Sequence, residues 1–531
     1  MRPQKIVVII VVLLLIITGG VFITSRLFKE VENAPKEYFI IVSITILLFV
    51  CLIIRRGLHR LIESLQSRHF LNGVVVVCLL TTIHGFLQYF GIFSSNHSAF
   101  PITGTFENPA GFAAVQAALY PFVVTRCFDR ENSRWMRLFS VAVSIICFIS
   151  VVLSGSRTGI LALCSVIVVV MAYTDAIASF FKSHRWLWLP IIVITIASLI
   201  LLYYVKQDSA DGRIFIWNRC FEMIKERPLF GYGVYGFHHY YMSAQADYFR
   251  THPDSPFIML ADNVTHPFNE YIKLTVNYGL VGLFTALALL LGIVWKLFRS
   301  DKRTKVIGIS YVTSIFIMCQ FSYPFRYAVV WLMTLLTIIP ILIKDIKALN
   351  ILAYIRLMIS MLLLFFFAST LYKMYYDMKW TEISKRSIIG QTNKMLKYYE
   401  GMKSIMKYNP LFLYNYAAEL NYSGHYEESL ALNSQCMKMW NDYDVQILFA
   451  NNYAYLKDKE KAIQSYNQAY NMIPCRFEPL YGEMLVYMDF NDTINIMRIA
   501  DEITEKPIKV RSSRVSFIIE RAKQILSYYD Q

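Results

Sequence analysis

Three polar segments interrupt a largely apolar chain, and they hold the side chains that could do chemistry. They are residues 103–110 (TGTFENPA), residues 154–159 (SGSRTG) and the long stretch 206–270, which has Arg213 near its start and His266 near its end. Arg can hold phosphate oxygens in a planar, bidentate fork. A neutral His can take a proton from a hydroxyl near pH 7. These residue types could bind a phosphate group and activate a hydroxyl.

Arg157 is the single charged residue in a short turn between two apolar stretches. A charge held at membrane depth is costly, so such a residue is a candidate for function. The alternative is an Arg that extends to the lipid headgroups and anchors a helical hairpin.

His266 lies where the long stretch returns to an apolar run, and it is the best candidate base. Asn269 and Glu270 follow within one helical turn and could orient it. The alternative is an ordinary surface histidine. A metal site competes, because His238, His239 and His252 share the stretch with Asp254 and Asp262. Adjacent histidines lack the i, i+4 spacing of a helical zinc site, so we predict no metal.

Composition indicates a membrane protein. The chain has 531 residues, of which 56% are hydrophobic and 17% charged, and its mean hydropathy is +0.42. The net charge of +15 comes mostly from Lys and Arg in short loops between apolar runs, which disfavours nucleic-acid binding. The nine cysteines form no CxxC pair and no metal-binding spacing. The chain lacks a Walker A sequence, a GxSxG sequence and a Rossmann fingerprint, which disfavours an ATP-driven pump.

The apolar runs predict an all-α fold, a polytopic transmembrane helical bundle of about 11 spans. Each run is long enough to cross roughly 30 Å of hydrocarbon. The expected spans are residues 6–24, 38–54, 73–93, 110–126, 138–153, 159–181, 186–205, 271–295, 306–322, 327–343 and 352–372.

The distribution of Lys and Arg predicts the orientation. With the N-terminus in the cytoplasm, the inside loops hold about 20 of these residues and the outside loops about 11. No small-residue cleavage site follows the first span, so we expect an uncleaved anchor. An odd number of spans places the chain after about residue 374 outside the cytoplasm.

Residues 206–270 form the long outward loop. Asp211-Gly212 precede a predicted helix over residues 213–227, which Pro228 ends, and Gly231, Gly233 and Gly236 mark turns. Tyrosines and Phe237 follow. An amphipathic, aromatic element of this kind could lie in the membrane interface near a lipid substrate. The alternative is a plug that packs on the bundle.

The C-terminal part, residues 374–531, reads as a second domain after a membrane domain of residues 1–373. Pro410, Pro474 and Pro507 recur at multiples of about 33 residues, with Asn441-Asp442 at the intermediate boundary, a period that resembles tetratricopeptide repeats. The predicted helix pairs are 411–423 with 426–440, 444–456 with 459–472, and 476–489 with 493–505. Such an α-solenoid usually presents a concave face to a protein partner. The alternative is a module that only steadies the bundle.

Four segments together resemble the O-antigen ligase family, whose superfamily also contains O-antigen polymerases and protein O-oligosaccharyltransferases. They are GTFENPAGFAA, SGSRTG, GRIFIWNRCFEMIKERPLFGYGVYGF and THPFNEYIKLTVNYGLVGL, in this order and on one face. The resemblance covers roughly residues 70–345 and leaves out the repeat tail.

The resemblance implies a glycosyltransferase of the bacterial inner membrane that needs no metal and no cofactor. It would move a glycan from undecaprenyl pyrophosphate to an acceptor hydroxyl on the periplasmic face. Arg157 and Arg213 would hold the pyrophosphate, and His266 would activate the acceptor. Asn269, Glu270, Arg219 and Asn108 would support them. Members of the family commonly have twelve spans; eleven would place the tail in the periplasm.

Several functions remain open. The acceptor could be lipid A-core, as in a ligase of lipopolysaccharide biosynthesis, or protein, with the tail binding a protein partner. A polymerase would instead extend lipid-linked repeats. A transporter of lipid-linked glycan should carry charges at mid-depth and internal symmetry, and neither is evident. A scaffold built on the tail would leave Arg157, Arg213 and His266 without a shared role. If these three residues converge on one outward-facing cavity, the transferase is favoured.

Overall fold

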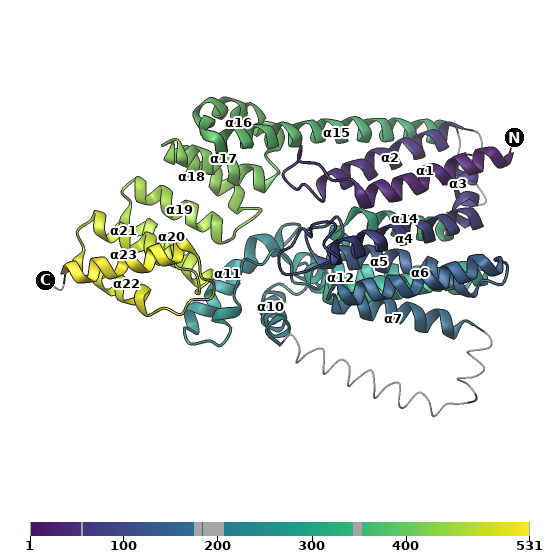
Figure 1. Cartoon of the computed structure of the whole chain (residues 1–531). Coiled ribbons are helices and arrows are strands. Elements are labelled where there is room, and N and C mark those ends of the chain that lie inside the picture. Colours follow the sequence, from purple (N-terminus) through teal and green to yellow (C-terminus); the bar gives the residue numbers. More distant parts are fainter. Residues whose placement is uncertain (1, 55–56, 175–182, 184–206, 344–352, 530–531) are drawn as a thin grey trace. The chain divides into compact units, whose positions relative to one another are not determined.

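The computed structural model describes residues 2–54, 57–174, 183, 207–343 and 353–529. In this part of the chain every regular element is a helix, as predicted (Figure 1). Contacts within the chain divide it into two compact units. Unit 1 comprises Met1–Leu202, Phe268–Glu270 and Thr285–Met378. Unit 2 comprises Tyr203–Pro267, Tyr271–Phe284 and Lys379–Gln531.

Unit 1 is built from apolar helices. They are α1 (Arg2–Phe22), α2 (Ala34–Ile53), α4 (Arg68–Tyr89), α5 (Pro109–Phe128), α6 (Arg134–Leu153), α7 (Arg157–Ala172), α13 (Lys302–Phe321) and α14 (Ala328–Ile343). The short α3 (Gly57–Gln66) and η3 (Pro324–Arg326) connect them. Two long helices, α12 (Glu270–Phe298) and α15 (Ala353–Arg386), contribute residues to both units.

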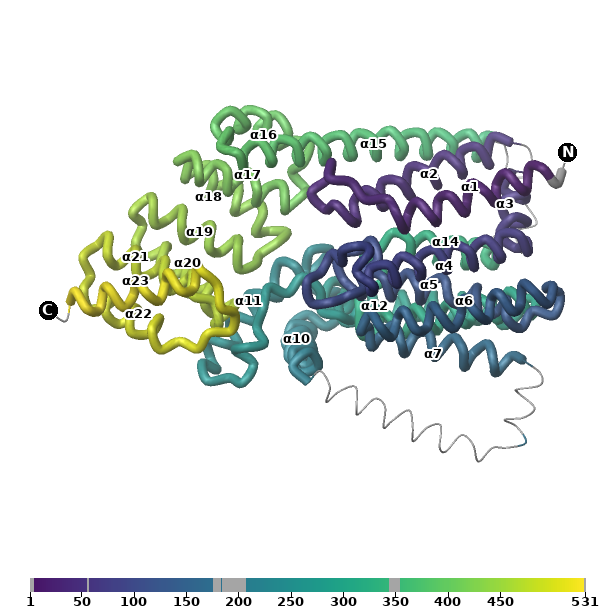
Figure 2. The backbone as a smooth tube through the Cα atoms, in the orientation of Figure 1, coloured from purple at the N-terminus to yellow at the C-terminus, as the bar shows by residue number. Residues whose placement is uncertain are grey.

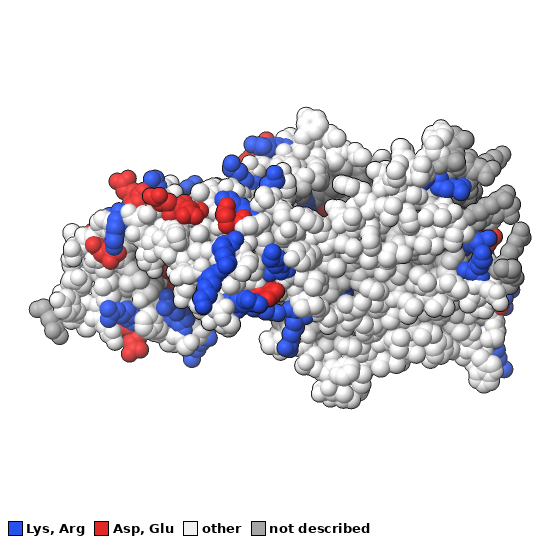
Figure 3. All heavy atoms as spheres, turned by 90° about the horizontal axis from the view of Figure 1, so that it is seen from above, with Lys and Arg blue, Asp and Glu red and all other residues white. Residues whose placement is uncertain are grey.

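Eight helices of the described residues have the length and apolar composition to cross a membrane. They include α1, α2, α4, α5, α6, α12, α13 and the stretch that begins with α15, while α7 and α14 are shorter apolar helices. The expected span at 186–205 lies outside the described residues, so the total of eleven stays a prediction. Figure 3 shows a broad face of unit 1 on which few charged side chains appear, as expected where lipid tails replace water.

Helix α5 lies at the centre of unit 1. It packs against α4, α6, α7, α13 and α14, and most of its residues are buried. Its inward residues are small, among them Ala113, Ala114, Ala117 and Ala118, each fully buried. Small side chains let neighbouring helices approach closely inside a membrane.

An ionic cluster joins the loops at one end of this bundle. The fully buried Arg126, at the end of α5, pairs with Asp129. Arg303, in the first turn of α13, lies 3.4 Å from the same Asp129. Arg68, at the start of α4, pairs with Glu131 at 2.7 Å. These loops are among those predicted to share the cytoplasmic side, and the structure brings them to the same end of unit 1.

The long loop contains two helices in unit 2. Helix α10 (Gln207–Glu226) begins six residues before the predicted start and contains Asp211-Gly212, while its end lies one residue before the predicted end. Helix α11 (Gly236–Thr251) was not predicted, because Gly231, Gly233 and Gly236 were read as turn signals. The segment from 252 to 269 that follows α11 contains one short helix, η2 (Ile258–Leu260).

The tail is helical throughout its described length. After the π-helical turn η4 (Ser387–Gln391) come α16 (Thr392–Met406), α17 (Pro410–Tyr422), α18 (Tyr426–Met437), α19 (Tyr443–Tyr455), α20 (Lys459–Met472), α21 (Glu478–Asp489), α22 (Thr493–Glu505) and α23 (Ser513–Tyr529). Six of these match the predicted helices within three residues at each end, and the predicted partners pack together (Figure 2). Their assignment to tetratricopeptide repeats stays a prediction. The nine cysteines all lie in the described residues, where none of them forms a disulfide.

Gly233 and Gly279 lie where the long loop contacts α12 inside unit 2. Backbone N–H groups of Tyr232 and Gly233 donate to the carbonyls of Val276 (3.0 Å) and Asn277 (2.7 Å). Helix α12 is kinked at Gly279, whose φ is +64°. A Cβ at Gly279 would lie 2.1 Å from the carbonyl oxygen of Leu229. The kink therefore needs glycine both for its backbone angle and for space.

Replacing Gly279 should destabilise this junction. We expect Gly279→Ala to lower the free energy of unfolding by about 1–3 kcal/mol, because alanine is strained at positive φ and its Cβ meets backbone. The thermal midpoint of the detergent-purified protein, followed by size-exclusion chromatography after heating, would measure this. Gly292→Ala is the matched control, since a Cβ there meets nothing within 4 Å. Equal midpoints for the two variants would contradict this account of the kink.

Candidate functional site

In unit 1, three polar segments meet at one end of α13. The side-chain amide of Asn108 (3.1 Å), the side-chain amide of Asn269 (3.4 Å) and the hydroxyl of Thr158 (3.5 Å) each donate to an atom of residues 320–323. These three residues come from the segments 103–110, 154–159 and the end of the long loop. The segments that the sequence singled out are therefore neighbours at one end of the bundle.

Arg157 is placed by a tight turn between two helices. Gly155 has φ +72° and ends α6. The hydroxyl of Ser156 accepts from the backbone N–H of Gly159 at 3.3 Å and caps α7, so that Arg157 is the first residue of this helix. Arg157 is half-buried. A guanidinium at the positive end of a helix dipole is well suited to an anionic ligand.

The side chain of Asn108 holds the segment before α5 in place through hydrogen bonds. Its side-chain oxygen accepts from the backbone N–H of Ala110 (2.9 Å) and Gly111 (3.3 Å), so Asn108 caps α5. Its amide donates to Tyr323, and the hydroxyl of Tyr327 donates to its oxygen at 3.3 Å. These contacts give Asn108 a structural role, and its support of a ligand stays a prediction.

An ionic network beside Asn108 was missed at the sequence level. Arg326 contacts Glu107 at 2.9 Å and Glu30 at 3.6 Å, and Asn33 donates to the same Glu107. Burial raises the pKa of Glu30, and Arg326 partly offsets this effect. Burial opposes the charge of Arg326, but Glu107 and Glu30 raise its pKa overall. The signal was present, because Arg326, like Arg157, is the lone charge between two expected spans.

Two arginines of α10, Arg213 and Arg219, lie in unit 2. Arg213 is half-buried in the second turn of α10. Arg219, one and a half turns later, lies over the ring of Tyr248 of α11, 4.3 Å from its centre. Its Nε is buried and has no hydrogen-bond partner among the described residues. This cation–π contact joins α10 to α11, and a role of Arg219 toward a ligand stays a prediction.

His266 lies in unit 2, where helices hold the segment around it. The indole N–H of Trp217, in α10, donates to the carbonyl of Pro267 at 2.8 Å. On α12, the ammonium of Lys273 lies 3.3 Å from Nδ1 of His266. Both His266 and Lys273 are half-buried. The sequence analysis missed Lys273, which follows His266 by seven residues and reaches it because α12 begins at Glu270.

The contact with Lys273 favours one tautomer of the His266 ring. An ammonium has donors and no acceptor, so Nδ1 must offer its lone pair. A neutral imidazole has one N–H, which then lies on Nε2. The contact therefore favours the tautomer of His266 in which Nδ1 accepts from Lys273 and Nε2 carries the proton.

The predicted site residues fall into two groups. Arg157, Asn108, Asn269 and Glu270 belong to unit 1, where Asn269 is buried and Glu270 begins α12. The second group belongs to unit 2 and consists of Arg213, Arg219 and His266. The convergence of Arg157, Arg213 and His266 on one cavity stays a prediction. Within the described residues, no three His, Cys, Asp or Glu side chains are grouped so that they could hold a metal ion.

One segment of the chain is similar to a known protein family. Residues 142–287 match the family model described as O-Antigen ligase. The match supports a membrane glycan transferase of the O-antigen ligase or polymerase type. A search of curated proteins gives no match. Together with the apolar helices, the O-antigen ligase match indicates a multi-pass membrane protein.

The matched segment contains most of the candidate site residues. Among them are Arg157, Arg213, Arg219, His266 and Lys273. It begins after Asn108 and ends before the tail, so neither is part of the O-antigen ligase match.

The tautomer of His266 can be tested directly. In protein labelled with ¹⁵N-histidine, we expect the His266 signals to show an unprotonated Nδ1 and a protonated Nε2. Lys273→Met should let the ring sample the other tautomer, because the donor to Nδ1 is lost. Lys273→Arg keeps a donor and is the matched control. A His266→Gln sample assigns the signals, and a protonated Nδ1 in the wild-type protein would contradict the assignment.

Proposed function

We propose that this protein is an inner-membrane glycan transferase acting on the periplasmic face. It moves an oligo- or polysaccharide from undecaprenyl pyrophosphate to an acceptor hydroxyl, as an O-antigen ligase does, without a metal or other cofactor. The acceptor is the lipid A-core, a second lipid-linked glycan or a protein. The observation that carries this proposal is the O-antigen ligase match over residues 142–287, which contains both candidate arginines and the candidate base.

The proposed roles follow from the chemistry of the donor. When the anomeric carbon–oxygen bond breaks, the electron pair leaves with the pyrophosphate. Arg157 and Arg213 hold the phosphate oxygens and strengthen their hold as negative charge develops. The acceptor oxygen attacks the anomeric carbon from the opposite side, and its proton passes to His266. One base and no covalent intermediate suffice for such an inversion.

Lys273 would link donor binding to the base. His266 can accept a proton on a nitrogen that has a free lone pair, and in the structure Lys273 contacts that nitrogen, Nδ1. We infer that the pyrophosphate draws the ammonium of Lys273 away and frees Nδ1 for the acceptor proton. Before the donor binds, His266 would therefore be a poor base.

Glycan transfer in cells tests the proposal. We expect His266→Ala or Arg157→Ala to lower transfer by about 100-fold or more and to accumulate the lipid-linked donor. Gels that separate lipid-linked glycan, lipopolysaccharide and glycoprotein would show which product is lost and so name the acceptor. Protein levels are compared by blot.

His252→Ala and Arg250→Ala are matched controls, because both residues are exposed on the same loop. They should transfer glycan as the wild-type protein does. Normal products in His266→Ala and Arg157→Ala would overturn the assigned site and favour a transporter or a scaffold.

Cysteine labelling tests the periplasmic placement of the tail. Ile494, in α22, is 83% exposed, and Trp135, near the start of α6, is 81% exposed. We expect a membrane-impermeant maleimide to label Ile494→Cys in cells whose outer membrane alone is permeable, and Trp135→Cys after lysis. The wild-type protein gives the background from its nine native cysteines. The reverse pattern would place the tail in the cytoplasm.

A further inference from the structure

Within unit 2, one turn of the tail contacts the loop that carries His266. This tail turn, residues 437–442, connects α18 to α19. The backbone N–H of Asn441 donates to the carbonyl of His238 at 3.0 Å, and its side chain donates to Ser243 at 3.1 Å. The ring of His239 bonds to the carbonyl of Met437. The tail turn is thus joined to the first turns of α11 by several polar contacts.

The tail turn also contacts the loop close to His266 itself. The side-chain amide of Asn263 donates to Asp442 at 3.0 Å. The same carboxylate accepts from the indole N–H of Trp440 at 2.8 Å and so fixes the indole ring. Because Asn263 precedes His266 by three residues, the tail turn restrains the backbone that leads to the candidate base.

A row of three rings joins the tail turn to His266. The indole of Trp440 stacks on the ring of His238, with centroids 4.6 Å apart and planes 13° apart. The ring of His238 meets the ring of His266 edge-on, with centroids 6.1 Å apart and planes 76° apart. Lys273 contacts His266 from α12. The imidazole of His266 therefore has neighbours from the loop and from α12, and the loop neighbour is itself supported by the tail.

We propose that Trp440 is a positioning residue, and that the tail turn orients His266 through the stack of Trp440 on His238. This inference rests on the proposed function, in which His266 is the base. It assigns the tail a part in the chemical step, besides any binding of a protein partner.

The local structure explains why such support is needed. Between the end of α11 and the start of α12 the described chain has one regular element, the three-residue η2. A segment of this kind keeps a side chain in place when its neighbours restrain it. A misplacement of about 1 Å in a catalytic group can cost about 100-fold in rate.

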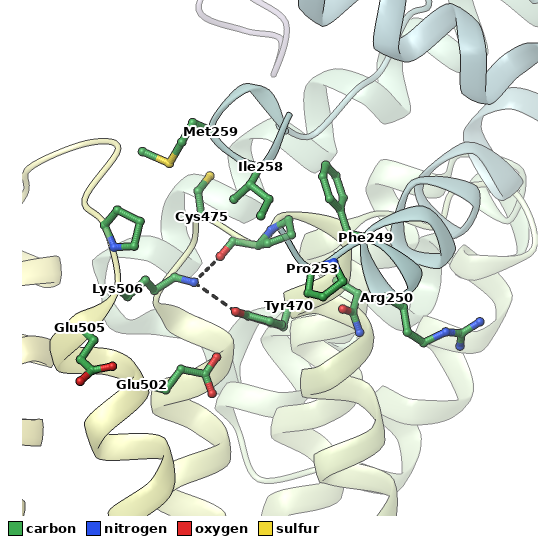
Figure 4. A pocket seen from close by; sticks show the side chains of 13 residues that line it. Phe249, Arg250, Pro253, Ile258, Met259, Tyr470, Cys475, Glu502, Glu505 and Lys506 are labelled. Atoms are coloured by element: carbon green, nitrogen blue, oxygen red, sulfur yellow. Dashed lines mark hydrogen bonds between the residues drawn. The ribbon is translucent and has the colours of Figure 1, made fainter. Parts of the chain in front are cut away.

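Loop and tail also meet further along the same surface. A cavity of about 380 Å³ is lined by Ile258 and Met259 of the loop and by Tyr470 and Lys506 of the tail (Figure 4). The ammonium of Lys506 donates to the carbonyl of Pro474, next to this cavity. Beside it, Lys509 donates to the carbonyl of Ala261 at 3.0 Å. The contact of the tail turn with α11 is therefore one end of a longer seam inside unit 2.

Steady-state kinetics of the full-length protein in nanodiscs test the proposal, with an undecaprenyl pyrophosphate-linked glycan as donor. We expect Trp440→Ala to lower kcat by about 10- to 100-fold with little change in the KM of the donor, because the base is misplaced and donor binding is not. Trp440→Phe keeps a ring on His238 and should retain kcat within about threefold of the wild-type value.

Tyr422→Ala is the matched control in the tail. Tyr422 ends α17, is 79% exposed, and belongs to no part of the tail turn. This variant should keep both kcat and KM, and circular dichroism should show that all variants retain their helices.

A double-mutant cycle separates positioning from general stability. If Trp440 acts through His238, Trp440→Ala should cost little further rate in a His238→Ala background. Additive losses, equal losses in Trp440→Ala and Trp440→Phe, or an unchanged kcat in Trp440→Ala would each overturn the proposal. If Trp440→Ala fails to fold, the comparison of His238→Ala with His238→Phe decides the same point.

The outcome for His266 distinguishes the two proposals. Activity retained in His266→Ala overturns the proposed function and this inference with it. Activity lost in His266→Ala but retained in Trp440→Ala overturns the role of the tail turn alone.

Discussion

The close packing of α5 is the contact on which the rest of unit 1 depends. Its small residues bring neighbouring helices near its axis, and a Cβ added at Gly159 of α7 would lie 2.8 Å from the Cβ of Ala113. In a bilayer, an apolar side chain gains little by contacting another helix instead of lipid. Close packing is therefore a main source of the association between helices. The approach of α7 to α5 also fixes where Arg157 begins α7. The packing of α7 against α5 thus helps to determine which polar segments become neighbours.

Polar groups at that end of unit 1 depend on one another. Glu107 is held by Arg326 and Asn33, while Asn108 next to it caps α5 and contacts Tyr323 and Tyr327. Removing one partner of an ion pair in a protein interior leaves the other ion unpaired, and this costs more free energy than the intact pair contributes to stability. The network therefore stabilises one arrangement of the helix ends. The proposed transfer needs cationic groups that do not reorganise as charge develops. A network that fixes the helix ends on this side of unit 1 is consistent with that need.

Unit 2 holds its candidate base by a different means. His266 lies in a segment with little regular structure, and its surroundings come from four parts of the chain. Trp217 fixes the following carbonyl, Lys273 contacts the ring, and His238 lies beside it with Trp440 of the tail behind. The loop and the tail form one folded unit. A tail that contacts the loop so closely can influence the reaction without touching a substrate.

The sequence by itself determined the class of fold, most of the helices and the candidate residues. Apolar runs of membrane length and the spacing of Pro410, Pro474 and Pro507 are local patterns, and they report local structure directly. Pro228 was enough to locate the end of α10. Helix α11 was missed although Phe237, Tyr241 and Tyr248 recur at helical spacing, because nearby glycines gave a competing turn signal. Tertiary structure alone decided the partners: Lys273 for His266, Arg326 for Glu107, and Trp440 for His238. Such pairs join residues 7, 219 and about 200 positions apart, and periodicity carries no information about which distant surfaces meet when the helices pack.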